Sequence, residues 1–370
     1  MSDWRLREPY GNAYELPRTL NAQHQEHKIK HPLYGLLTSP VYRAFTGLGM
    51  AAQPAARLIS TLIVVALLFA FVRLMTVCEI APRLHLPMLM LVAAAPGIVV
   101  YAGLPESWTL SALLVVVAVL LHERWPDRRL MFGCFVGLTM LCNVSLLVLL
   151  ALPVVACSQE GRGWQRTILC SAATGVSLTA TFLGVLLLLG QFDQSLSPQQ
   201  YIAFYQFFSP LIKAVDWYSR TAVEVSLSQL FVGGFVSLQD NTDLHWYGVY
   251  STAKGSALGA LAVTTIVTFW IFIGGVAIRN RRHGLHSTAR FRAQRLTVLL
   301  MVQWLLLHIG SANSMFLYAG CFIPLMVLIA GIELTAARYR SELAVWSVAP
   351  VVFATSWVQM NYLRNVLGAT

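Results

Sequence analysis

Residues 56–77 decide the fold of this chain, and they read ARLISTLIVVALLFAFVRLMTV. The stretch is long enough to cross the hydrocarbon core of a bilayer, which takes about 20 apolar residues in a helix. Its continuous Leu, Val and Ala content lacks the alternation of a barrel strand. Because backbone groups in lipid must pair within their own segment, the stretch is predicted to be a transmembrane helix.

Similar apolar runs follow along the whole chain. They lie at about 86–103, 109–122, 130–156, 167–190, 256–278, 295–309, 317–335 and 344–363. Hydrophobic residues make up 57% of the chain and charged residues only 11%, a balance that excludes a soluble domain of this size. The predicted fold is therefore all-α, a polytopic transmembrane helical bundle whose first partner is the lipid bilayer.

The formal charge of +10 indicates orientation in a membrane, and we expect no nucleic-acid partner. Arginine supplies 22 of the 26 basic residues, and these arginines are spread over short loops between apolar runs. The positive-inside rule places the loop between residues 279 and 295 in the cytoplasm. That loop has no acid and holds six arginines: Arg279, Arg281, Arg282, Arg290, Arg292 and Arg295. Arginine-rich inner loops and compact outer loops favour a location in the cell (plasma) membrane. Among plasma membranes they favour the bacterial inner membrane.

The run at 130–156 leaves two topologies open, because it either crosses the membrane once or dips in and returns. The choice inverts the orientation of everything before it. A returning segment places more of the basic residues on the cytoplasmic side. Its 27 residues also exceed one comfortable span, and Gly133, Gly137, Asn143 and Pro153 interrupt them. We therefore predict paired short helices at 130–156.

This topology divides the chain into four parts. Residues 1–55 form an extracytoplasmic N-terminal loop segment, and 56–190 form transmembrane helices. Residues 191–255 form an extracytoplasmic loop with amphipathic helices, and 256–370 return to transmembrane helices. No cleavable signal peptide opens the chain. A translocated N-terminal segment needs a preceding helix, so a first transmembrane helix is expected to be missing from this sequence.

The N-terminal segment is rich in titratable groups. Glu15 stands three residues before Arg18, and His31 follows in the sequence His31-Pro32-Leu33. A carboxylate beside a cation that holds phosphate suits transfer from a phosphate-linked donor. The alternative is a solvated tail. The histidines have no further metal-ligand spacing, so no metal ligand is assigned and a divalent metal has no support from spacing.

Two short polar segments complete the candidate site. In Leu104-Pro105-Glu106-Ser107-Trp108, Glu106 and Ser107 either cap the next helix or contact a substrate. Asn313 precedes a helix that carries Tyr318, which either faces a cavity or belongs to an interfacial tyrosine belt.

The long loop at 191–255 mixes aromatic and charged side chains. This mixture favours amphipathic helices that lie on the membrane surface with their rings at the headgroups. Stacking of the rings on sugars is the alternative.

The order of these segments resembles the GT-C superfamily, specifically the polyprenyl-phosphate-sugar transferases similar to glycosyltransferase family 39. Glu15 matches an acid in the first outer loop of that family, and His31-Pro32-Leu33 matches a segment that follows it. Pro105-Glu106-Ser107 is similar to a turn that opens a helix, and residues 133–153 look like paired short helices. Met315-Phe316-Leu317-Tyr318 looks like a late outer-loop motif.

The resemblance implies a membrane glycosyltransferase, a hexosyl- or pentosyltransferase that moves a sugar from a polyprenyl-phosphate carrier to an acceptor at the outer membrane face. It implies Glu15 as base, Arg18 and His31 as donor-phosphate ligands, and Glu106, Ser107, Asn313 and Tyr318 as residues that shape the site. The sequence departs from the family in offering glutamate where aspartate is usual. The competing functions are a catalytically inactive structural relative and a transporter or flippase.

Overall fold

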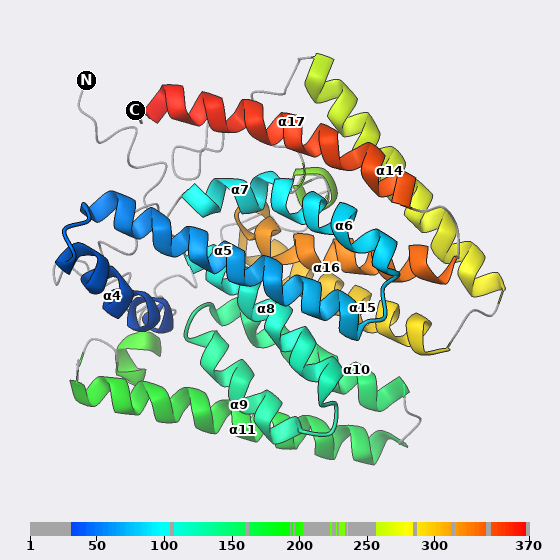
Figure 1. The fold of residues 1–370 in the computed structure, drawn as a ribbon. Helices are drawn as coiled ribbons and strands as arrows, with labels where there is room; N and C mark the ends of the chain where they lie inside the picture. The colour runs from blue at the N-terminus through cyan, green and yellow to red at the C-terminus, as the bar shows by residue number, and fades with distance from the viewer. Residues whose placement is uncertain are drawn as a thin grey trace.

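Every element that the computed structural model describes is a helix (Figure 1). The structure describes residues 31–103, 107–159, 163–192, 257–283, 287–311, 315–337 and 342–367, and between 193 and 256 it describes 194, 197–202, 223, 227, 229–233 and 235. The elements are α4 (Pro32–Gly47), α5 (Ala52–Val77), α6 (Pro82–Ala94), α7 (Pro96–Gly103), α8 (Ser107–Arg124), α9 (Arg129–Met140), the 3₁₀ helix η1 (Val144–Leu150), α10 (Ala151–Gln159), α11 (Gly163–Phe192), the π-helical turn η3 (Gln229–Gly233), α14 (Ala257–Arg282), α15 (Ser287–Ser311), α16 (Met315–Ala336) and α17 (Glu342–Leu367).

The core of the bundle is built around α16. From Cys321 to Leu334 nearly every apolar side chain of this helix is buried, and α16 packs against α6, α7, α8, α14 and α15. Figure 1 shows α16 in the middle of the bundle, with α17 on one side and α8 on the other. A helix that is apolar all round is typical of a protein core or of a membrane span, and in this bundle α16 takes the core position.

Four of the described helices are long and apolar enough to cross a membrane: α5 from Pro54, α8, α11 and α14. Two of them, α11 and α14, lie at the edge of the bundle and expose large apolar side chains. Val176 on α11 is 69% exposed and Ile271 on α14 is 71% exposed. Apolar surface of this extent is unusual for a monomeric soluble protein and suits contact with lipid.

The helices run between two ends of the bundle. At the first end, which we call the His31 end, α4, α8 and α16 begin. At the second, which we call the arginine end, α8 finishes beside the start of α15, where Glu123 pairs with Arg292. The finish of α14 and the finish of α16 also meet there, since Asn280 donates to Glu333 at 2.8 Å.

The chain between 129 and 159 travels to the His31 end and back. At its start, the Phe132 ring contacts the His122 ring at 5.5 Å, near the arginine end. Beyond α9, the Leu141 carbonyl accepts a hydrogen bond from Leu33 N, at the His31 end. At the finish of α10, Gln159 donates to a backbone carbonyl of α15, again at the arginine end. The segment of α9, η1 and α10 therefore reverses direction within the bundle.

The reversal does not occur at the glycines that we expected to interrupt the segment. Gly133 and Gly137 lie inside α9, where a Cβ on Gly137 would lie 2.6 Å from the Leu178 carbonyl oxygen of α11. Their function is close packing of two helices. Asn143, which was also among the expected interruptions, makes the turn: its side-chain oxygen accepts a hydrogen bond from Ser145 N at 3.0 Å and caps η1. Pro153, the fourth expected interruption, lies inside α10.

Other elements also differ from the expected ranges. The apolar run at 86–103 is two helices, α6 and α7, joined at Ala95 with extended backbone (ψ 132°). Pro96 explains the break because it disfavours helical backbone in the residue before it. The expected loop at 1–55 contains helix α4 and the start of α5. The expected amphipathic helices at 191–255 lie mostly outside the described residues.

Candidate functional site

His31 anchors the start of α4 to the turn between α9 and η1. Its side chain is buried, with 2% of its surface exposed, and its Nδ1 lies 2.5 Å from the carbonyl oxygen of Cys142. Because a carbonyl only accepts, Nδ1 carries the proton and donates it. Two residues further on, Leu33 N donates to the Leu141 carbonyl at 3.1 Å. The two contacts fix the register of α4 on the turn.

The first residues of α8 lie against this anchor. Ser107 and Trp108 are both buried, and the Trp108 ring meets the His31 ring edge-on with centroids 6.2 Å apart. The Trp108 carbonyl accepts a weak hydrogen bond from the Cys321 thiol of α16 at 3.9 Å. Segments that begin at residues 31, 107 and 315 are therefore packed together at one end of the bundle.

A short polar chain continues from α8 into the turn before η1. The Ser111 hydroxyl donates to the Ser107 carbonyl at 3.0 Å, and Asn143 Nδ2 donates to Ser111 Oγ at 3.5 Å. Both Ser111 and Asn143 are buried. Buried polar groups need partners, so this chain specifies how the α9–η1 turn sits on α8.

The structure brings together some of the residues expected from the sequence. His31 and Ser107 both lie in the cluster around Trp108. Tyr318 belongs to α16, one helical turn before Cys321, and its side chain lies outside the described residues. The remaining expected site residues also lie outside the described residues: Glu15, Arg18, Glu106 and Asn313.

Several helix ends lie together at the His31 end. The N-termini of α4, α8 and η1 meet there through the contacts of His31 and Asn143. The end of α9 lies there too, and its Leu141 and Cys142 carbonyls accept hydrogen bonds from Leu33 N and His31.

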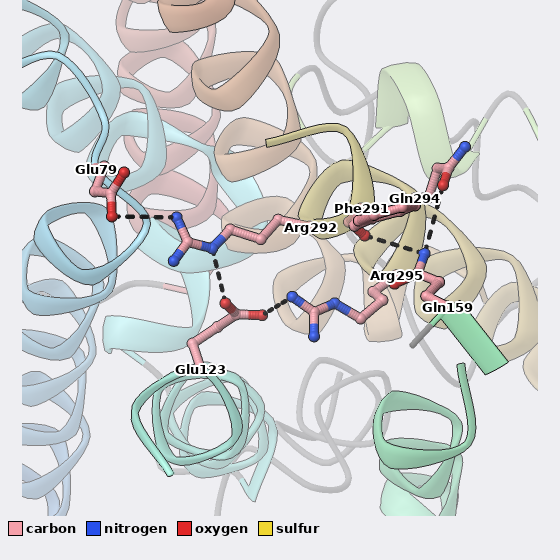
Figure 2. Close-up of polar contacts among 7 residues, drawn as sticks. All are labelled: Glu79, Glu123, Gln159, Phe291, Arg292, Gln294 and Arg295. Atoms are coloured by element: carbon pink, nitrogen blue, oxygen red, sulfur yellow. Dashed lines mark hydrogen bonds and ion pairs between the residues drawn. The ribbon is translucent and has the colours of Figure 1, made fainter. Parts of the chain in front are cut away.

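The arginine end holds a second charged cluster, drawn in Figure 2. One carboxylate oxygen of Glu123 accepts from Arg292 Nε at 2.9 Å, and the other lies 3.0 Å from Arg295 Nη2. Only 6% of the Glu123 side chain is exposed, and the two arginines are 14% and 15% exposed. Glu79 is 80% exposed and reaches Arg292 at 3.8 Å. This cluster ties α8 to α15.

Cys78 lies beside this cluster, at the C-terminal cap of α5. Burial, together with the nearby Glu123 carboxylate, raises the pKa of the Cys78 thiol to about 12. A thiol with so high a pKa is a poor nucleophile near neutral pH. Cys78 therefore contributes to packing and is not a reactive group.

The sequence interpretation missed the pairing of Glu123. It assigned Arg292 and Arg295 to membrane orientation only. The signal that could have found the pair is Glu123 itself, an acid at the end of a strongly apolar helix in a chain with only 16 acids. Such an acid needs a basic partner, but the sequence does not say which arginine supplies it.

Among the residues that the structure describes, no group of three His, Cys, Asp or Glu side chains is arranged to hold a metal ion. Two further histidines of the N-terminal segment, His24 and His27, lie outside the described residues. A scan against protein-family models, a search of curated proteins and a search of solved structures each found no match to this chain.

Proposed function

We propose that this chain is a multi-pass protein of the plasma membrane whose arginine end faces the cytoplasm. Four described helices are long and apolar enough to cross a bilayer, and α11 and α14 expose apolar side chains along their length. The arginine-rich segment at 279–295 lies at one end only, as the positive-inside rule requires. The His31 end then faces the outer surface.

We further propose that the protein is a glycosyltransferase that takes a sugar from a polyprenyl-phosphate carrier at the outer face. One observation carries this proposal: His31, the start of α8 and the first half of α16 meet at the His31 end. These three segments are far apart in the sequence. The helix N-termini gathered there favour the carrier phosphate.

The proposed roles follow from this chemistry. Glu15 is the base that takes the proton of the acceptor hydroxyl, and Arg18 offsets the charge of the departing lipid phosphate. His31 positions α4, because its Nδ1 is committed to the Cys142 carbonyl. Its ring can donate to phosphate through Nε2 only when it is protonated. Glu106, Ser107, Asn313 and Tyr318 shape the site around the sugar.

Sugar transfer by the purified protein in liposomes tests the function. Radiolabelled polyprenyl-phosphate sugar is the donor, and transfer of label out of the lipid fraction is measured. We expect Glu15→Gln to reduce transfer by at least about a hundredfold, the lower range for loss of a general base. Glu26→Gln removes an acid from the same segment and is expected to leave transfer unchanged.

The outcomes separate the competing functions. Undiminished transfer by Glu15→Gln would refute the role of Glu15 as base. Absence of transfer by the unsubstituted protein across a panel of hexosyl and pentosyl donors would favour an inactive structural relative. Movement of the intact lipid-linked sugar between leaflets without transfer would favour a flippase.

A further inference from the structure

A pocket opens at the arginine end between the last residues of α14, the first turns of α15 and the last turns of α16. It combines basic, polar and apolar side chains. Asn280, Arg281, Arg290, Gln294 and Glu333 supply the polar part of the lining. The apolar part comes from Ala289, Ala293, Ile332 and Ala336. It is separate from the His31 end, where the proposed transfer takes place.

The two arginines of the pocket are available for an anion. Arg281 and Arg290 are exposed, and none of the described acidic side chains lies within 4.0 Å of either guanidinium. Arg292, two residues further along α15, is by contrast paired with Glu123 at 2.9 Å. The pocket acid, Glu333, accepts the amide of buried Asn280 at 2.8 Å. Exposed guanidinium groups that are not paired with a carboxylate suit a phosphate group.

An exposed apolar face of α14 lies next to Arg281. Ile271, Gly275 and Ile278 share one face of the helix, and Arg281 lies at the edge of that face about one turn beyond Ile278. Ile271 is 71% exposed and Ile278 is 54% exposed. A Cβ on Gly275 would meet nothing within 4 Å, so the surface there is open. This exposed face is apolar, as contact with a hydrocarbon chain requires.

We propose that this pocket binds the phosphate of an anionic membrane phospholipid. Arg281 and Arg290 contact the phosphate, and an acyl chain lies on the exposed face of α14 beside Gly275. Basic pockets between helices at the cytoplasmic membrane surface are known to take anionic headgroups. The proposal rests on the membrane placement of the arginine end and does not depend on sugar transfer.

Native mass spectrometry of the protein released from nanodiscs tests the proposal. The nanodiscs contain phosphatidylcholine with a small fraction of phosphatidylglycerol, and the amount of phosphatidylglycerol retained on the protein is measured. We expect Arg281→Gln with Arg290→Gln to weaken retention about tenfold or more, because two charge-assisted contacts to phosphate are lost. The matched control is Arg124→Gln with Arg166→Gln, which removes two exposed arginines from the same end and is expected to retain the lipid.

Three outcomes would overturn the proposal. Equal losses in the two double variants would show attraction by overall charge and no site. Equal retention of phosphatidylcholine and phosphatidylglycerol would show that the headgroup charge is not recognised. Displacement of phosphatidylglycerol by millimolar inorganic phosphate would identify a soluble anion as the ligand. Unchanged size-exclusion profiles confirm that each variant is folded before the comparison is made.

Discussion

Glu123 shows how one side chain can join two helices of this bundle. It is nearly buried and accepts from two arginines of α15, Arg292 and Arg295. Removal of one member of such a group leaves the other charges buried without compensation, and the cost exceeds the value of the intact pair. Glu79 touches the same Arg292 from an exposed position and contributes little by comparison.

We therefore predict that Glu123→Gln lowers the free energy of unfolding by about 3 kcal/mol, because two arginines lose their shared carboxylate. Unfolding of the purified protein by denaturant in mixed micelles measures the change. Glu79→Gln is the matched control and is expected to change stability by about 0.5 kcal/mol or less. Equal effects of the two substitutions would contradict the assignment of Glu123 as the central carboxylate.

The backbones of helices α9 and α11 lie so close together that two glycines of α9 have no room for a side chain. A Cβ on Gly133 would lie 2.4 Å from the Thr174 carbonyl oxygen, and one on Gly137 would lie 2.6 Å from that of Leu178. Both contacts are with backbone, which cannot rotate away. Glycines four residues apart that let two helix backbones meet are a common packing device in membranes.

Gly137→Ala is predicted to destabilise the protein by about 2 kcal/mol, since the added methyl group must push α9 away from α11. The midpoint of thermal unfolding in detergent measures the effect. Gly184→Ala, on α11, serves as control because its Cβ would meet nothing within 4 Å. Alanine is favoured over glycine in a helix, so the control is expected to be neutral or slightly stabilising.

At the scale of the whole molecule, the reversal between α9 and α10 determines which residues share a side of the membrane. Arg128 lies before α9 and Arg166 lies in the first turn of α11. If the segment between them returns, both arginines are on the cytoplasmic side. If it crosses once, they are on opposite sides.

Single cysteines at Leu48, Arg128 and Arg166 in a background without the native cysteines test this topology. We expect a membrane-impermeant maleimide to label the Leu48→Cys variant on intact cells. The Arg128→Cys and Arg166→Cys variants are expected to react only after permeabilisation. Labelling of Arg128 and Arg166 from opposite sides would show a single crossing and would separate the segments of the proposed site.

Sequence and structure agree at some elements of the bundle and differ at others. Residues 56–77 were predicted as a membrane-spanning helix, and α5 covers them. The break at Ala95 was missed because the run on both sides of Pro96 is uniformly apolar, and hydropathy cannot tell one helix from two. Gly133 and Gly137 were interpreted as interruptions because a glycine that ends a helix and one that packs two helices look alike in sequence.

What the sequence determined by itself is the class of fold and the separation of charge. Long apolar runs have only one way to satisfy their backbone in lipid, and the arginine-rich loop marks one end. Only the tertiary structure decided the partners. In the tertiary structure His31 contacts Trp108 and Cys142, and Glu123 forms ion pairs with Arg292 and Arg295. The physical reason is that local hydrophobicity determines which segments form helices. The contacts between side chains depend instead on which helices pack together and in what register.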